Sequence, residues 1–175
     1  MFINPDNIVN SLPIHPGMVV ADIGAGSGAF SIPFAKAVGS SGKVYSIDVQ
    51  RELLSRIQSD AQSVGLRNIS ILWGNAEQHN GTHLKDKGVD VVLVSNVLFQ
   101  IEHKENFAKE IFRVLKKTGF VVLIDWTESF GNLGPKQDHV ISESKAKELF
   151  ESCGLIYSQR IHTGSHHYGI IFKHG

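Results

Sequence analysis

The sequence is poor in cysteine, in net charge and in long apolar runs, and each shortage excludes a class of protein. Cys153 is the only cysteine among 175 residues, so no intrachain disulfide can form, which is typical of a reducing compartment. The 17 basic and 17 acidic side chains cancel, which argues against strong non-specific binding to nucleic acid or to an anionic membrane. No apolar run approaches the ~20 residues of a membrane span, and the first residues lack the pattern of a secretory signal. We therefore expect a cytoplasmic protein that binds no membrane.

The rest of the composition is that of an ordinary globular chain, with 42% hydrophobic and 19% charged residues. At this length we expect one domain over residues 1–175. Residues 1–16 would form an N-terminal cap segment with a short amphipathic helix over 5–12, which prolines end. Residues 17–175 would form an α/β core.

The most informative stretch runs from Met18 to Phe30. It begins as a continuous apolar run, typical of a buried strand, and then places glycines at Gly24, Gly26 and Gly28 before apolar residues continue at helical spacing. Glycine allows positive φ and a close approach of a ligand to the main chain, and a helix amino terminus offers unpaired N–H groups. The pattern therefore predicts the start of an α/β nucleotide-binding unit, with a turn that binds nothing as the alternative.

The motif Asp22-x-Gly24-x-Gly26-x-Gly28 resembles motif I of the class I S-adenosylmethionine (SAM) dependent methyltransferases. The same glycines with Ala29 also fit the dinucleotide-binding fingerprint, so the glycines alone leave a nicotinamide-binding Rossmann module open. The acid two residues before the first glycine favours the methyltransferases, whose members commonly have an acid there.

Polar residues at later strand ends extend the resemblance. Asp48 ends an expected strand, where a carboxylate can accept hydrogen bonds from both hydroxyls of a ribose or can cap the next helix. Asn75 lies in a stretch that resembles the family's motif for reading the adenine edge. Many members of that family have Asp at this position. An Asn-containing turn is the alternative for Asn75. Ser95 and Asn96 would face the methionine part of SAM, because ligands of open parallel sheets lie at the carboxyl ends of strands. The expected cofactor-binding residues are Asp22, Gly24, Ala25, Gly26, Gly28, Phe30, Asp48, Val49, Asn75, Ala76, Ser95 and Asn96.

The remaining patterns complete a doubly wound α/β fold. The resemblance implies a mostly parallel, seven-stranded sheet with helices on both faces and an antiparallel C-terminal hairpin. Lys117 and Thr118 replace the usual Pro and Gly before the fifth strand, and we expect a turn to persist through Gly119. The closing hairpin and the lack of a second domain favour a methyltransferase over a dehydrogenase. The periodicity predicts helices over 51–64 and 141–153, and strands over 43–48, 69–73, 89–95, 155–161 and 168–173.

Catalytic residues are harder to infer, because methyl transfer from SAM is a displacement at an already activated carbon. A base is needed only when the acceptor must lose a proton. The candidate bases are His139, Asp125 and His15, chosen from their expected location. The loop over 127–140 is long enough to suggest a functional role. Nine histidines are present, but His162, His166 and His167 have no recognised ligand spacing, so we expect no metal.

The sequence thus predicts an enzyme that transfers a methyl group from SAM to a small-molecule acceptor and releases S-adenosylhomocysteine. An RNA or protein acceptor, or a SAM-binding protein without catalysis, is the alternative. In such methyltransferases the N-terminal segment often covers the cofactor or the substrate, and a purely packing helix is the other interpretation. The oligomeric state is not indicated.

Overall fold

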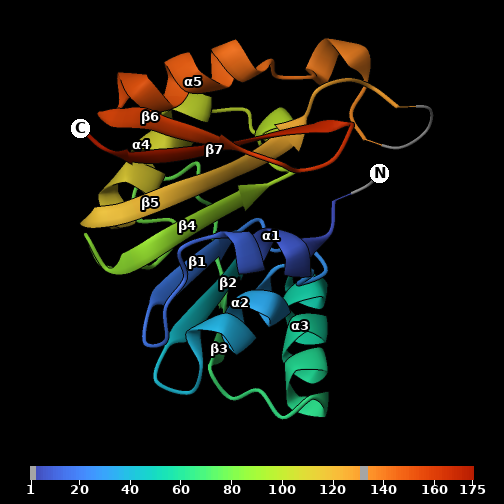
Figure 1. Ribbon diagram of the computed structural model, residues 1–175, viewed down its shortest axis with the longest axis vertical. Helices are drawn as coiled ribbons and strands as arrows, with labels where there is room; N and C mark the ends of the chain where they lie inside the picture. The colour runs from blue at the N-terminus through green and yellow to red at the C-terminus, as the bar shows by residue number, and fades with distance from the viewer. Residues whose placement is uncertain (1–2, 131–133) are drawn as a thin grey trace.

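Seven strands form one sheet in the order β3-β2-β1-β4-β5-β7-β6 in the computed structural model, which describes residues 3–130 and 134–175 (Figure 1). Strands β1 to β5 are parallel, and β7 is antiparallel to both β5 and β6. The expected mostly parallel sheet with an antiparallel C-terminal hairpin is therefore confirmed. The strands are β1 Val19–Ile23, β2 Lys43–Asp48, β3 Ile69–Trp73, β4 Val89–Ser95, β5 Leu115–Trp126, β6 Leu155–Ile161 and β7 His167–His174.

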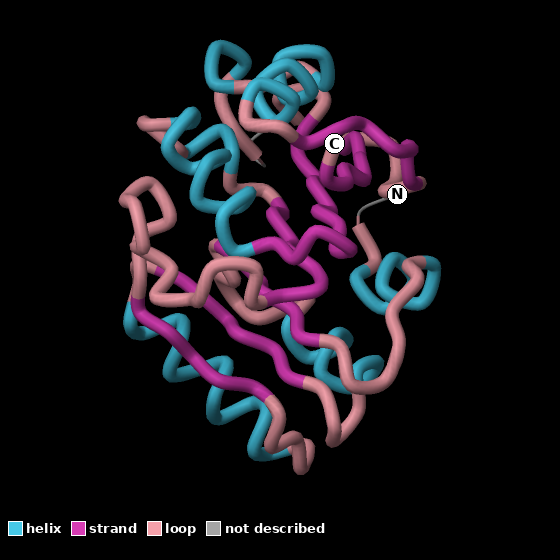
Figure 2. Tube along the Cα trace, turned by 90° about the vertical axis from the view of Figure 1, so that its left-hand side faces the viewer, coloured by secondary structure: helices cyan, strands magenta, loops and turns pink. Residues whose placement is uncertain are grey.

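Helices cover both faces of the twisted sheet (Figure 2). One core cluster joins α1 and α2 to the sheet, and the largest cluster lies on the opposite face under α4 and α5. Within the described ranges no helix is long and apolar enough to cross a membrane. The helices are α1 Pro5–Ser11, α2 Ser31–Val38, α3 Arg51–Ser63, α4 Lys104–Val114 and α5 Glu143–Ser152, with short 3₁₀ turns at η1 Leu98–Gln100 and η2 Gln137–His139.

The N-terminal helix α1 is a packing element. The Asn4 side chain caps it by accepting a hydrogen bond from the Asn7 N–H, and Pro5 occupies the first turn, where no N–H is needed. Ile8 and Val9 are buried in the cluster shared with α2 and the sheet. The described part of the expected cap segment therefore stabilises one face of the core.

The start of β5 differs from the sequence prediction. We expected a turn at Gly119, but β5 already begins at Leu115, which pairs with Val89. The pairing then shifts register and resumes with Phe120 opposite Val91. Gly119 fits inside this irregularity because a Cβ there would lie 2.5 Å from the carbonyl oxygen of Asp90. The glycine thus allows close strand packing instead of a turn.

Other boundaries shift by one to three residues. Helix α5 begins at Glu143 because the Ser142 side chain caps it, accepting a hydrogen bond from the Lys145 N–H. The helix after the glycine turn begins at Ser31. The expected 127–140 loop contains η2, and its residues 131–133 lie outside the described part of the chain.

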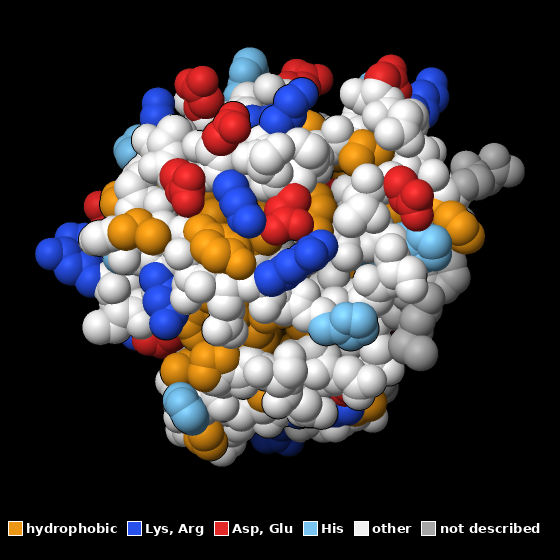
Figure 3. Space-filling view, turned by 45° about the horizontal axis from the view of Figure 1, so that its top comes forward, with side chains coloured by type: hydrophobic (Ala, Val, Ile, Leu, Met, Phe, Trp, Pro, Cys, Tyr) orange, Lys and Arg blue, Asp and Glu red, His pale blue; other side chains and the backbone are white. Residues whose placement is uncertain are grey.

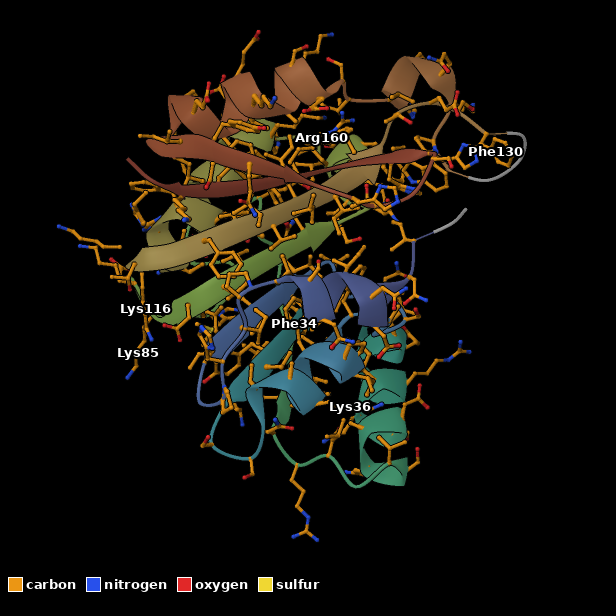
Figure 4. All side chains as sticks on the ribbon, viewed as in Figure 1. Phe34, Lys36, Lys85, Lys116, Phe130 and Arg160 are labelled. Atoms are coloured by element: carbon orange, nitrogen blue, oxygen red, sulfur yellow. The ribbon has the colours of Figure 1, made fainter. Side chains whose placement is uncertain are left out.

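The two ends of the parallel strands face opposite sides of the molecule. Lys85 and Lys116 lie near the amino ends of β4 and β5, while Phe130 follows the carboxyl end of β5 at the far side (Figure 4). Strands β1 and β4 pair with each other, and the strand order reverses between them. In open α/β sheets this switch point is where a crevice forms at the carboxyl ends.

Candidate functional site

A cleft of about 440 Å³ lies at the carboxyl ends of β1, β2 and β4. Its size is within the range of small-ligand sites in proteins. Eleven of the twelve residues expected to bind the cofactor line it, and Gly28 is the exception. The eleven are Asp22, Gly24, Ala25, Gly26, Phe30, Asp48, Val49, Asn75, Ala76, Ser95 and Asn96.

The three glycines of the turn after β1 have different surroundings, although each has positive φ. A Cβ on Gly24 would collide with the Val97 side chain, and one on Gly28 would lie 2.7 Å from Ile57 of α3. Around Gly26 the nearest atom to such a Cβ is the Gly24 carbonyl oxygen, 3.9 Å away. Gly28 therefore serves helix packing outside the cleft, whereas Gly26 leaves open space beside the main chain.

The Asp48 carboxylate holds the glycine turn to the end of β2. One oxygen accepts a hydrogen bond from the Gly26 N–H and the other from the Gln50 N–H, both at 2.9 Å. Gln50 is the N-cap residue of α3, so Asp48 also bonds the start of that helix, which was the alternative role expected for it. Each carboxylate oxygen can accept a further hydrogen bond, which leaves capacity for ribose hydroxyls.

Asp22, in the cleft lining, connects β1 with α2 and β2. The Ser31 hydroxyl donates to the Asp22 carboxylate at 2.6 Å, and the Ser31 and Ser46 hydroxyls are 2.7 Å apart. Burial raises the pKa of Asp22 to about 6, although the hydrogen bond from Ser31 opposes this shift. This network fixes the strand end on which the glycine turn is built.

Two short segments form facing walls of the cleft, and we call them the β3 wall (residues 74–77) and the β4 wall (residues 95–101). In the β3 wall, the Asn75 side-chain oxygen accepts a hydrogen bond from the Glu77 N–H at 2.9 Å. The Asn75 amide therefore keeps its NH₂ group available as a donor. Sequence reasoning did not select Glu77, although it belongs to the same polar run.

Asn96 in the β4 wall has an unusual conformation. Its φ is +57°, a left-handed value that Asn tolerates better than most residues, and its N–H donates to the Ile124 carbonyl. Within the described residues its buried Oδ1 has no hydrogen-bond partner. An amide oxygen is an acceptor that suits an amino group such as that of methionine, but this one is closed to solvent, so the Asn96 side chain would have to turn toward the cleft to bond a ligand.

Several further lining residues escaped the sequence prediction. Val97, Gln100 and Ile101 follow β4 directly, so their place after a strand end was the available signal. Phe107 of α4 gave no signal beyond helical periodicity. The others are Ile23, Ser27, Ala29, Ile47, Gln50, Leu53 and Gly74.

The three candidate bases lie outside the cleft lining. Asp125 is 1% exposed, and its carboxylate accepts hydrogen bonds from the Leu98 and Trp126 N–H groups. Burial raises the pKa of Asp125 to about 6 against these bonds. His139 on η2 and His15 before β1 are both exposed. Asp125 therefore supports the β4 wall from behind, and the catalytic assignments remain predictions.

The histidines of the β6–β7 hairpin are not gathered as metal ligands. His166 contacts Glu128 at 2.9 Å, and the buried His167 ring packs against Trp126 with 4.1 Å between ring centroids. In the described ranges, no group of three or more His, Cys, Asp and Glu side chains is placed to hold a metal ion.

Comparison with known proteins places the chain in a family. The methyltransferase domain family matches residues 14–168. A demethylmenaquinone methyltransferase of Geobacillus stearothermophilus is 26% identical over 122 residues, covering 70% of this chain and 51% of that protein. A ubiquinone/menaquinone biosynthesis C-methyltransferase of Hydrogenovibrio crunogenus is 28% identical over 163 residues, covering 85% and 61%. The chain thus spans about half to three fifths of the length of these relatives.

Solved structures support the same assignment. A SAM-dependent methyltransferase from Aquifex aeolicus superposes with a TM-score of 0.87 at 26% identity, covering 98% of this chain and 89% of that one. An arsenic(III) SAM methyltransferase from Chlamydomonas reinhardtii, at 22% identity and a TM-score of 0.72, shares the fold. The family match, the sheet topology and the cleft at the switch point agree with the resemblance found in motif I. The chain is a member of the class I SAM-dependent methyltransferase family.

Proposed function

We propose that this chain transfers the methyl group of SAM to a small-molecule acceptor. The main support is the cleft, which Gly26 with the open space beside it, the Asp48 carboxylate and Asn96 all line. A glycine main chain, a ribose acceptor and an amino-group acceptor are the features that a nucleoside joined to an amino acid requires. The nicotinamide alternative lacks support from the family match.

In this proposal each part of the cleft has one task. Asp48 would hold the ribose, the β3 wall with Asn75 and Ala76 would hold the adenine, and the β4 wall with Ser95 and Asn96 would hold the amino-acid end. SAM supplies a methyl group already activated by a sulfonium. The protein then has to align the acceptor and exclude water from the cleft.

The acceptor is constrained by the carboxylates of the cleft. The lining contains three acids, Asp22, Asp48 and Glu77, and each accepts hydrogen bonds from a serine hydroxyl or from backbone N–H groups. None of the three is therefore free of structural bonds, although each carboxylate keeps acceptor capacity. An acceptor whose nucleophile ionises readily suits such a cleft, and a phenolic or quinol ring is the simplest example. The relatives named for quinone substrates make reduced quinones the first compounds to test.

A macromolecular acceptor has less support. The net charge of zero provides little attraction for RNA. The face seen in Figure 3 carries acidic and basic side chains interspersed instead of one basic patch. A SAM-binding protein without catalysis has the same cleft, so turnover has to be measured directly.

The test is calorimetric titration with SAM, S-adenosylhomocysteine and NADH, followed by transfer of labelled methyl groups to reduced naphthoquinones. We expect micromolar binding of both SAM and S-adenosylhomocysteine, no binding of NADH, and label on the quinol. Binding without transfer to any small molecule or RNA would favour the non-catalytic alternative. Binding of NADH alone would overturn the proposal.

A further inference from the structure

One side chain joins the two walls of the cleft. Glu77 belongs to the β3 wall, and its Oε2 accepts hydrogen bonds from the N–H groups of Glu102, at 3.0 Å, and His103, at 2.6 Å. These two residues follow the β4 wall directly and precede α4. The bond to His103 spans 26 positions in the sequence, so it fixes a tertiary distance instead of a local turn.

The amino end of α4 needs such a partner. The N-cap residue His103 makes no side-chain capping bond of its own. The first N–H groups of a helix lack partners within the helix, and the positive end of the helix dipole favours a carboxylate. Glu77 supplies an acceptor and a negative charge from the opposite side of the cleft.

The same residue is coupled to the expected adenine reader. The Glu77 N–H donates to Asn75, so the side chain of Asn75 and the carboxylate of Glu77 form one linked unit. On the other side, Gln100 and Ile101 line the cleft immediately before Glu102. A displacement of the α4 amino end would therefore change the spacing between Asn75 and the β4 wall.

We propose that Glu77 is a positioning residue that sets the width of the cleft at its nucleoside end by bonding the β3 wall to the amino end of α4. The predicted effect on cofactor affinity rests on the proposed SAM binding. The bridge from Glu77 to Glu102 and His103 does not depend on that proposal. Glu77 has no direct contact with the reacting atoms in this role.

Three substitutions separate the parts of this role. Glu77→Ala removes the bridge. In the wild type, Oε2 of Glu77 accepts both hydrogen bonds. Glu77→Gln keeps one side-chain oxygen that can take this place, but it removes the negative charge. Glu105→Ala is the matched control, because it deletes an exposed carboxylate from the first turn of the same helix. If Glu77→Ala fails to fold, Glu77→Asp shortens the side chain by one methylene and serves for the same measurements.

The first readout needs no ligand. Amide hydrogen exchange at Glu102 and His103 should become faster by about tenfold or more in Glu77→Ala, since a lost bond to a charged group has that scale. Glu77→Gln should retain most of the protection, and Glu105→Ala should match the wild type. Unchanged exchange in Glu77→Ala, or equal acceleration in Glu105→Ala, would overturn the bridge.

The second readout is affinity for S-adenosylhomocysteine and for adenosine. In Glu77→Ala both should bind about tenfold or more weakly and by a similar factor, with recovery in Glu77→Gln. A loss for S-adenosylhomocysteine without a loss for adenosine would overturn the assignment to the nucleoside end. If the wild type binds neither ligand, the proposed function fails, and the exchange measurement still decides whether Glu77 bridges the walls.

Discussion

The Asp48 carboxylate accepts a hydrogen bond from the Gly26 N–H across a distance of 2.9 Å, so the end of β2 holds the glycine turn that follows β1. The two residues are 22 positions apart in the sequence. Their contact means that the residue expected to bind ribose also shapes the loop beside it. Affinity and stability should therefore both depend on Asp48.

Replacing Asp48 by Ala should lower the free energy of unfolding by about 1.5–3 kcal/mol, because the N–H groups of Gly26 and Gln50 lose a charged acceptor. SAM affinity should fall by a similar amount if the ribose also bonds there. Urea unfolding and calorimetric titration measure the two effects, with Asp60→Ala, at an exposed position on α3, as the control. Unchanged affinity would remove the ribose role and leave the structural one.

The glycines at 26 and 28 should differ in how alanine affects ligand affinity. Gly28→Ala places a Cβ 2.7 Å from Ile57 at a φ of +78°, so overpacking of about 1–3 kcal/mol adds to a backbone cost of about 1 kcal/mol, with little effect on affinity. Gly26→Ala meets no such atom and pays about 1 kcal/mol for its φ of +54°. Its Cβ occupies the space beside the main chain, so S-adenosylhomocysteine should bind more weakly than to Gly28→Ala. Calorimetry and urea unfolding of both variants measure these effects, and the reverse order of affinities would refute the assignment.

The sequence was sufficient to predict the sheet and most of the cleft for physical reasons. Buried parallel strands are continuous apolar runs, and their carboxyl ends meet at one edge, so Asp48, Asn75 and Asn96 could be grouped without coordinates. Gly28 could not be separated from Gly26, because the Ile57 contact comes from a helix elsewhere in the chain. The local pattern was the same for both glycines.

The candidate bases lie outside the cleft lining, and their catalytic roles stay predictions. Asp125 does lie at a strand end, but its carboxylate accepts a hydrogen bond from the Leu98 N–H and does not line the cleft. A strand-end position fixes the edge of the sheet and does not tell whether a carboxylate faces the ligand or a neighbouring loop. Glu77 was missed because its partners, Glu102 and His103, are distant in sequence.

His167 should make the protein sensitive to mild acid. The residue is 5% exposed, and within the described residues neither ring nitrogen has a partner. Burial, with a smaller effect of His166, lowers the pKa of His167 to about 4. Because the folded-state pKa lies below the unfolded value of 6.5, stability is complete above pH 6.5 and is lost as pH falls toward 4.

The variant His167→Phe should remove this sensitivity. Its advantage over the wild type should grow by about 2 kcal/mol between pH 7 and pH 5, since only the unfolded wild type gains a proton there. Urea unfolding at both pH values measures the difference. His162→Phe, at an exposed position of the same hairpin, should show no such growth. Parallel pH curves for wild type and His167→Phe would contradict the buried neutral imidazole.

The ion pair of Glu110 and Arg113 should dominate the acid limit. Burial would raise the pKa of Glu110, but hydrogen bonds from Arg113 and Thr82 outweigh it and lower the pKa to about 2. Stability from Glu110 is therefore present above its ordinary value of 4.5 and is lost as pH falls through 2. The pair holds the segment before β4 to α4, since the Asn80 and Thr82 N–H groups also donate to Glu110.

Glu110→Gln should cost about 1.5–3 kcal/mol at pH 7, because Arg113 loses the buried one of its two carboxylate partners and keeps only the exposed Asp86. The cost should shrink at pH 3, where part of the wild-type advantage is already lost. Arg160→Ala breaks an exposed pair with Glu143 and should change stability by less than about 1 kcal/mol (Figure 4). Guanidinium unfolding of both variants at both pH values measures the loss of unfolding free energy. An equal loss in the two variants would contradict the prediction.

The position of β7 between β5 and β6 has a consequence for synthesis on the ribosome. β6 precedes β7 in the chain but touches the sheet only through it, so β6 has no neighbour to pair with until β7 has emerged. Until then the nascent chain presents β5 as an open edge, which is the kind of surface that pairs with other chains. Cellular yield of this protein should therefore depend on how quickly β6 and β7 are translated and on chaperones that shield the β5 edge in the meantime.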